Sequence, residues 1–161
     1  MGSRGSVIPF FCNIANGVPT PITSPEMTRF MIDLGQAVDL VNSAFAEAVG
    51  GEIFVKKIPS MRVIDIAKAI RPFEPIEVIG IRPGEKLHEQ MVGASDCLRT
   101  IDTSDFYVII PELASRYEAY IERFGDQFVE KDFIYRSDLN TVWMSISELK
   151  TWLDGNRGKW L

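Results

Sequence analysis

Apolar residues recur at helical spacing most clearly in the stretch after Asp33. The repeating positions are Leu34, Ala37, Val38, Val41, Ala44, Phe45 and Ala48. Steps of three and four residues place these side chains on one face of a helix. Asp33 and Gln36 have the spacing of a capping box, and the pair of glycines at 50–51 ends the pattern. We therefore predict an amphipathic helix between Asp33 and the glycine pair.

Shorter patterns on both sides of this helix predict further strands and helices. The predicted strands are 28–32, 52–55, 76–81 and 106–110, and the predicted helices are 7–14, 60–70, 116–124 and a last one after 145. Ser60 is expected to cap the helix that ends at Arg71, and Ser145 with Glu148 forms a second capping box. Strands that alternate with helices along the chain predict an α/β fold.

The composition narrows the class of protein. The chain is 46% hydrophobic and 24% charged, and it has no apolar run near the roughly 20 residues that span a bilayer. The first residues lack the apolar core of a secretory signal, so we expect a cytoplasmic protein without a membrane partner. A net charge of −5 without a basic cluster argues against nucleic acid as a partner.

Cysteine and histidine usage restricts the chemistry further. Cys12 and Cys97 lie far apart without a Cys-x-x-Cys spacing, which is typical of reduced structural thiols. His88 is the only histidine, so histidine clusters are excluded and we expect no metal site. A lone histidine between Glu85 and Glu89 is more often a surface or supporting group, and we assign it no catalytic role.

Two short segments combine glycine or proline with arginine in a way that core packing does not require. Residues 2–6 place glycines and hydroxyls ahead of a helix start, where free N–H groups favour an anion such as phosphate. Arg82 stands on a turn stiffened by proline, and its planar guanidinium pairs well with phosphate oxygens. The alternative is that Arg82 is a solvated turn residue, Arg29 a strand-edge charge and Arg4 an incidental charge. Spacing alone does not decide between these readings.

Two catalytic signatures are absent from the sequence. None of the four tyrosines is followed four residues later by lysine, and no glycine-rich dinucleotide fingerprint follows a predicted strand. We therefore predict neither catalytic nor cofactor-binding residues in this chain.

Four ordered blocks resemble a known family. The blocks are MGSRGSVIPFF (1–11), MTRFMI (27–32), GEIFVKKIPSM (51–61) and IGIRPGEKLHE (79–89). They resemble the inverting UDP-N-acetylglucosamine 4,6-dehydratases, which are polysaccharide biosynthesis proteins of the extended short-chain dehydrogenase/reductase superfamily. The resemblance covers residues 1 to about 92, and more loosely 99–110 and 135–149. The KKIPSM and IRPGEKLHE blocks are closer to the pseudaminic-acid dehydratases than to the capsule enzymes.

The resemblance implies that the chemistry belongs to residues outside this sequence. In that family an N-terminal Rossmann half holds NADP, a Tyr-x-x-x-Lys pair and an Asp-Lys pair that serves the elimination. The product is a 4-keto-6-deoxy sugar nucleotide with inverted C5. Met1 aligns with an internal position, so the chain resembles a truncation. We expect a nucleotide-sugar-binding C-terminal domain over 1–161, best matched over 1–110 and looser over 111–161, with the Rossmann core missing and no NADP bound.

The same resemblance assigns roles to residues that match its motifs. Arg29 and Arg82 resemble the pair that clamps the diphosphate of UDP-N-acetylglucosamine or UDP, and Glu85 resembles a partner of the ribose hydroxyls. The expected neighbours of the uracil are Ser6, Val7, Pro21 and Ile22. Arg4 is expected to face the sugar or the phosphates. Two arginines on a diphosphate satisfy charges that are costly to desolvate, so this assignment agrees with the chemistry of the residues.

The family fold also implies lost partner surfaces. There, the strand 52–55 joins the parallel Rossmann sheet and the helix after Asp33 packs on that sheet. We therefore expect an exposed apolar patch, with self-association or binding of a separate N-terminal half. Two alternatives for the function stay open: a fragment of a related nucleotide-sugar epimerase or capsule-type dehydratase, and a stand-alone, non-catalytic UDP-sugar-binding module.

Overall fold

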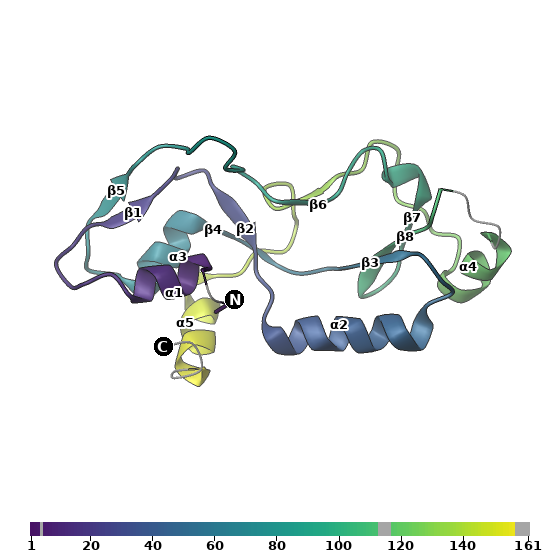
Figure 1. Ribbon diagram of the computed structural model, residues 1–161, viewed down its shortest axis with the longest axis horizontal. Coiled ribbons are helices and arrows are strands. Elements are labelled where there is room, and N and C mark those ends of the chain that lie inside the picture. Colours follow the sequence, from purple (N-terminus) through teal and green to yellow (C-terminus); the bar gives the residue numbers. More distant parts are fainter. Residues whose placement is uncertain (4, 113–116, 157–161) are drawn as a thin grey trace.

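The computed structural model describes residues 1–3, 5–112 and 117–156. It shows an elongated molecule in which two lobes lie side by side (Figure 1). Helices and small sheets are mixed in it, so the prediction of a fold that combines helices and strands is confirmed. No helix in the described ranges is long and apolar enough to cross a membrane.

The first lobe contains both chain ends of the described part. Its elements are α1 (Val7–Cys12), β1 (Thr20–Ile22), β2 (Thr28–Phe30), β4 (Ser60–Arg62), α3 (Val63–Ile70), β5 (Ile76–Val78) and α5 (Ile146–Gly155). β1 pairs with β5 in parallel, and β2 pairs with β4 antiparallel. Helix α3 forms the centre of the core: Ile66 is fully buried and packs in one cluster with Phe11 from α1 and Leu149 from α5.

The second lobe is a small antiparallel sheet covered by a short helix. Its elements are β3 (Ile53–Lys56), η1 (Cys97–Arg99), β7 (Thr100–Asp102), β8 (Phe106–Ile109) and α4 (Tyr117–Phe124). The strand order is β3-β8-β7, which leaves β3 at one edge. Ile101, Val108 and Tyr120 are buried together between sheet and helix. A further antiparallel pair, β6 (Gln90–Val92) with β9 (Tyr135–Arg136), lies between the lobes (Figure 1).

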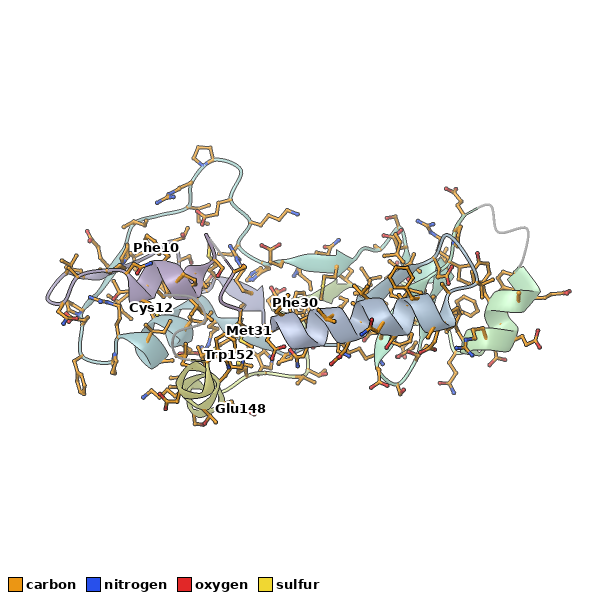
Figure 2. The ribbon with its side chains drawn as sticks, turned by 60° about the horizontal axis from the view of Figure 1, so that its bottom comes forward. Phe10, Cys12, Phe30, Met31, Glu148 and Trp152 are labelled. Carbon is orange, nitrogen blue, oxygen red and sulfur yellow. The ribbon has the colours of Figure 1, made fainter. Side chains whose placement is uncertain are left out.

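Helix α2 (Leu34–Glu47) has the predicted capping box. The Gln36 N–H donates to Asp33 Oδ1 at 2.8 Å, and the Asp33 N–H donates to Gln36 Oε1 at 3.1 Å. The helix nevertheless contains no buried residue, and Leu34 and Phe45 are 78% and 85% exposed. It lies along the lower side of the molecule in Figure 1 and crosses the front of the view in Figure 2. The apolar face that the sequence predicts is therefore present and largely exposed, with Ala37 and Ala44 half-buried.

Two local predictions were wrong. Ser60 does not cap a helix: it lies in β4, where its N–H donates to Val142 O at 2.9 Å and its hydroxyl accepts from Asn140 Nδ2 at 3.0 Å. These long-range bonds use the groups that a cap would need, and α3 begins at Val63 without a side-chain cap. The strand predicted over 76–81 stops at residue 78, because Gly80 turns the chain with a φ of +84°.

Candidate functional site

A cleft with a volume of about 1140 Å³ opens in the first lobe. Its walls come from the chain start and α1, from β1 and β2, and from the turn after β5. The predicted site residues that line it are Ser6, Val7, Pro21, Ile22, Arg29, Arg82 and Glu85. The remaining one, Arg4, lies outside the described residues. Segments that are far apart in the sequence thus meet around one space of the size that a nucleotide-sized ligand needs.

Strand pairing brings the 79–85 turn to this cleft. β1 lies beside β5, and the Ile79 N–H extends the pairing by donating to Ile22 O at 2.9 Å. The turn beyond it is closed by the Glu85 N–H, which donates to Arg82 O at 3.0 Å. Gly84 has a φ of +81°, which a residue with a Cβ rarely adopts. The Arg-Pro-Gly sequence therefore holds Arg82 and Glu85 at the cleft.

The guanidinium of Arg29 is held mainly by backbone carbonyls. Nη1 donates to Thr28 O at 2.7 Å and to Leu87 O at 3.2 Å, and Nη2 donates to Lys86 O at 3.0 Å. Nε lies 3.5 Å from a carboxylate oxygen of Glu89. One of the five N–H groups of an arginine then remains for a ligand. Arg29 thus brings a fixed positive charge to the cleft and also ties β2 to the 86–89 segment.

Arg82 and Glu85 differ from Arg29 in their contacts. Arg82 is exposed, and its guanidinium makes no hydrogen bond to any residue that the structure describes. The backbone N–H of Arg82 lowers the pKa of the Glu85 carboxyl, and a hydrogen bond from Thr23 Oγ1 at 3.0 Å lowers it further. At neutral pH the site therefore holds an ionised acceptor beside a free guanidinium.

Apolar side chains also line the cleft, and one buried hydroxyl lies among them. Val7 is half-buried and Ile22 is buried, whereas Ser6 Oγ is buried without a hydrogen-bond partner among the described residues. Buried hydroxyls are normally bonded, so an orphaned one in a cleft wall suits a ligand that supplies the partner. Sequence reasoning missed Thr23 and Phe10, which also line the cleft. Thr23 directly follows the predicted residue Ile22, and Phe10 lies one helical turn after the predicted residue Val7, so their positions could have indicated that they line the cleft.

The other titratable groups that the structure describes do not form a second centre. Among the described residues no cluster of three or more His, Cys, Asp or Glu side chains is arranged to hold a metal ion. Both cysteines are free, and burial raises the pKa of the Cys12 thiol, which makes it less reactive.

The family model described as "Polysaccharide biosynthesis protein" matches residues 1–111. The chain belongs to this family. The matched range contains every predicted site residue and each wall of the cleft.

Similar proteins agree with membership of the polysaccharide biosynthesis protein family. The chain is 43% identical over 156 residues to the UDP-N-acetylglucosamine 4,6-dehydratase (inverting) of Campylobacter jejuni. The matched region covers 92% of this chain and 47% of that protein. It is 42% identical over 114 residues to a UDP-glucose 4-epimerase of Rickettsia canadensis, with 68% and 33% of the two chains covered. The X-ray structure of Pen from Bacillus thuringiensis superposes with a TM-score of 0.78 at 32% identity, over 98% of this chain and 46% of that one. The chain thus spans about half the length of the Campylobacter jejuni dehydratase and of Pen.

Proposed function

We propose that this chain is the UDP-sugar-binding part of a C5-inverting UDP-N-acetylglucosamine 4,6-dehydratase of bacterial surface-glycan or flagellin-sugar biosynthesis, and that it does not turn substrate over alone. The observation that carries the proposal is the cleft, which gathers an apolar wall, two guanidinium groups and an ionised carboxylate. A UDP-sugar has a flat base, a ribose and a diphosphate, and each part has a matching group there.

Each part of the UDP-sugar is assigned to the cleft residues whose chemistry suits it. Val7, Pro21 and Ile22 provide the apolar surface for the uracil, and Ser6 Oγ provides a hydrogen bond to it. Glu85 accepts hydrogen bonds from the ribose hydroxyls. Arg29 supplies a fixed charge for the diphosphate.

Arg82 completes the diphosphate site, because its guanidinium is free to form two parallel bonds with phosphate oxygens. Arg4 is proposed to face the sugar or the phosphates.

The proposal places no NADP on this chain. A dinucleotide site needs a glycine-rich turn from a strand into a helix. In the described residues, β2 leads into α2 and β4 leads into α3 without a glycine between strand and helix, and the connection from β6 to the short helix η1 has the single glycine Gly93. NADP and the catalytic residues are therefore proposed to act from a separate cofactor-binding half that covers α2, and the chain supplies only binding and orientation of the sugar nucleotide.

A UDP-glucose 4-epimerase relative favours a second candidate, in which the same cleft serves an epimerase. The two candidates share the UDP site and differ in the chemistry at the sugar. With a cofactor-binding half supplied, the first proposal predicts a 4-keto-6-deoxy product from UDP-N-acetylglucosamine. A C4 epimer would support the second candidate instead.

Calorimetric titration of the chain with UDP and with UDP-N-acetylglucosamine tests the binding part of the proposal, and incubation with UDP-N-acetylglucosamine and NADP tests the rest. We expect both ligands to bind and no product to form. Absence of binding would refute the first part, and product formation by the chain alone would refute the second.

A further inference from the structure

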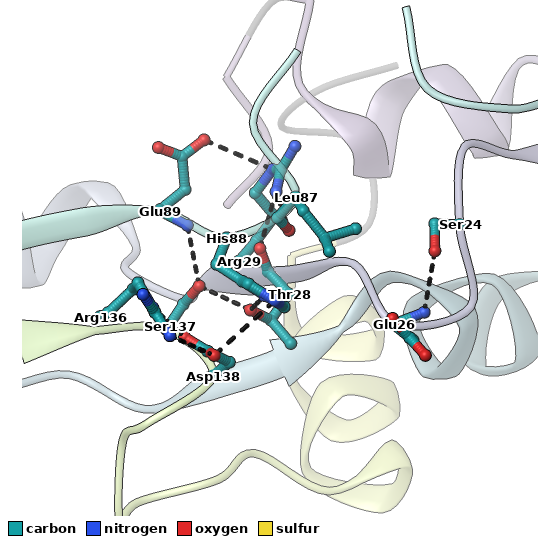
Figure 3. A network of polar contacts seen from close by, with 10 residues as sticks. All are labelled: Ser24, Glu26, Thr28, Arg29, Leu87, His88, Glu89, Arg136, Ser137 and Asp138. Atoms are coloured by element: carbon teal, nitrogen blue, oxygen red, sulfur yellow. Dashed lines mark hydrogen bonds and ion pairs between the residues drawn. The ribbon is translucent and has the colours of Figure 1, made fainter.

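A chain of hydroxyl and imidazole groups lies directly behind Arg29 (Figure 3). Thr28 Oγ1 is 2.9 Å from His88 Nδ1 and 2.6 Å from Ser137 Oγ. Ser137 Oγ accepts from the Glu89 N–H at 2.9 Å. Thr28 and Ser137 are 2% and 0% exposed. Thr28 is 60 residues from His88 and 109 residues from Ser137 in the sequence. The polar chain therefore joins three distant segments.

One arrangement of hydrogens satisfies every member of this chain. The Glu89 N–H donates to Ser137, the Ser137 hydroxyl donates to Thr28, and the Thr28 hydroxyl donates to His88 Nδ1. If Nδ1 carried the hydrogen, the Thr28 hydroxyl would donate to Ser137, whose own hydrogen would have no acceptor among the described residues. The buried chain therefore favours Nδ1 of His88 as an acceptor.

The far side of the imidazole is also fixed. His88 Nε2 lies 3.7 Å from Asp138 Oδ2, and Arg136 holds both oxygens of that carboxylate at 2.6 and 2.9 Å. The hydrogen bond from Arg136 lowers the pKa of Asp138, so a negative charge faces the Nε2–H. Both ring nitrogens are thus oriented, as a group with a precise geometric task requires.

The neighbours of His88 in the sequence hold the Arg29 guanidinium. This guanidinium donates hydrogen bonds to the carbonyls of Lys86 and Leu87, just before His88, and to the carbonyl of Thr28. The bond between His88 and Thr28 therefore joins the same two segments whose carbonyls aim Arg29. A shift of the imidazole changes the direction of that guanidinium.

We propose that His88 is a positioning residue for the diphosphate site. Its Nδ1 accepts from Thr28, fixes the 86–89 segment against β2 and so sets the guanidinium of Arg29 toward the cleft. This inference rests on the proposed function of the cleft. It assigns His88 no contact with the ligand and no proton transfer.

The test compares two replacements of the ring in titrations with UDP and with uridine. His88→Phe keeps a ring and removes both ring nitrogens, whereas His88→Asn keeps an acceptor near the Nδ1 position. We expect His88→Phe to weaken UDP about tenfold and uridine less than about twofold, because only UDP carries the diphosphate. His88→Asn should restore most of the UDP affinity. In an Arg29→Ala background, His88→Phe should have no further effect.

Other outcomes overturn the inference. Equal losses for UDP and uridine, or a further loss in the Arg29→Ala background, would give His88 a merely structural role. An unchanged UDP affinity in His88→Phe, with Arg29→Ala weakened, would refute this inference and leave the proposed function intact. If the unaltered chain does not bind UDP, both fall.

If His88→Phe does not fold, Thr28→Val against Thr28→Ser gives the same comparison from the other end of the bond. The valine variant should weaken UDP selectively, and the serine variant should not. Equal affinities of the two variants would overturn the inference.

Discussion

Arg71 follows the last residue of α3 and anchors the loop after α1, and its loss should cost far more stability than loss of Arg62, which precedes the first residue of α3. Its side chain is 6% exposed. The guanidinium donates to Thr20 Oγ1 at 2.9 Å and to the carbonyls of Ile14, Ala15 and Val18 at 2.7 to 3.0 Å. These bonds fix the chain between α1 and β1, which are two walls of the cleft.

The replacement Arg71→Met keeps most of the packing and removes all four hydrogen bonds, together with an ion pair to Glu74 at 3.9 Å. Bonds to a charged donor contribute about 1.5–3 kcal/mol each in favourable cases. Ala15 and Val18 are exposed, so their carbonyls regain water, and the variant no longer buries a charge. Thr20 is fully buried, so its hydroxyl oxygen loses the bond from Arg71 without gaining water. We therefore expect a loss of about 3 kcal/mol, which for a chain of this length lowers the melting temperature by about 6–12 °C.

Arg62→Met is the matched control. The Arg62 side chain is 60% exposed and makes one ion pair, to Asp65 at 3.0 Å, so its loss should cost less than about 0.5 kcal/mol. Urea unfolding followed by circular dichroism measures both variants. A loss below about 1 kcal/mol for Arg71→Met, or equal losses for both variants, would refute the reasoning.

Two further predictions concern the second lobe and α2. Replacing Val41 and Phe45 together by serine should reduce hydrophobic-dye binding and self-association with little change in melting temperature, since these side chains are 52% and 85% exposed; unchanged dye fluorescence and sedimentation would contradict this. Burial, followed by the charges of Asp102 and Tyr135, raises the pKa of Tyr107 to about 12 from an ordinary value of 10.0. The unfolded chain then releases this proton first, so stability should fall as pH rises from about 10 to about 12. Tyr107→Phe should make that fall shallower, and an identical slope in alkaline unfolding would be evidence against it.

The elements that the sequence predicted well are those specified by neighbouring residues. The capping boxes at Asp33 and Ser145 are read from residues three apart, and both are present. The site residues were inferred from contiguous motifs that resemble a family; the structure places seven of them around one cleft, and their roles stay predictions.

The elements that were missed depend on long-range pairing. Strands such as β6 and β9 are two or three residues long and too short to show alternation. Ser60 has the local sequence of a cap, yet its backbone pairs with a segment more than 80 residues away. The role of His88 was hidden for the same reason, since Ser137 contributes to its surroundings from the far end of the chain. Sequence spacing contains no information about such partners.

The central claim is that the cleft holds the diphosphate of a UDP-sugar, and Arg82 tests it most directly because its guanidinium supports no other described part of the structure. Calorimetric titration with UDP should give at least about tenfold weaker binding for Arg82→Ala, since one charge-assisted hydrogen bond contributes about 1.5 kcal/mol or more. Arg123→Ala, which removes a half-exposed arginine on α4 in the other lobe, should bind UDP like the unaltered chain. Equal affinity of Arg82→Ala and the unaltered chain, or no binding by either, would contradict the account.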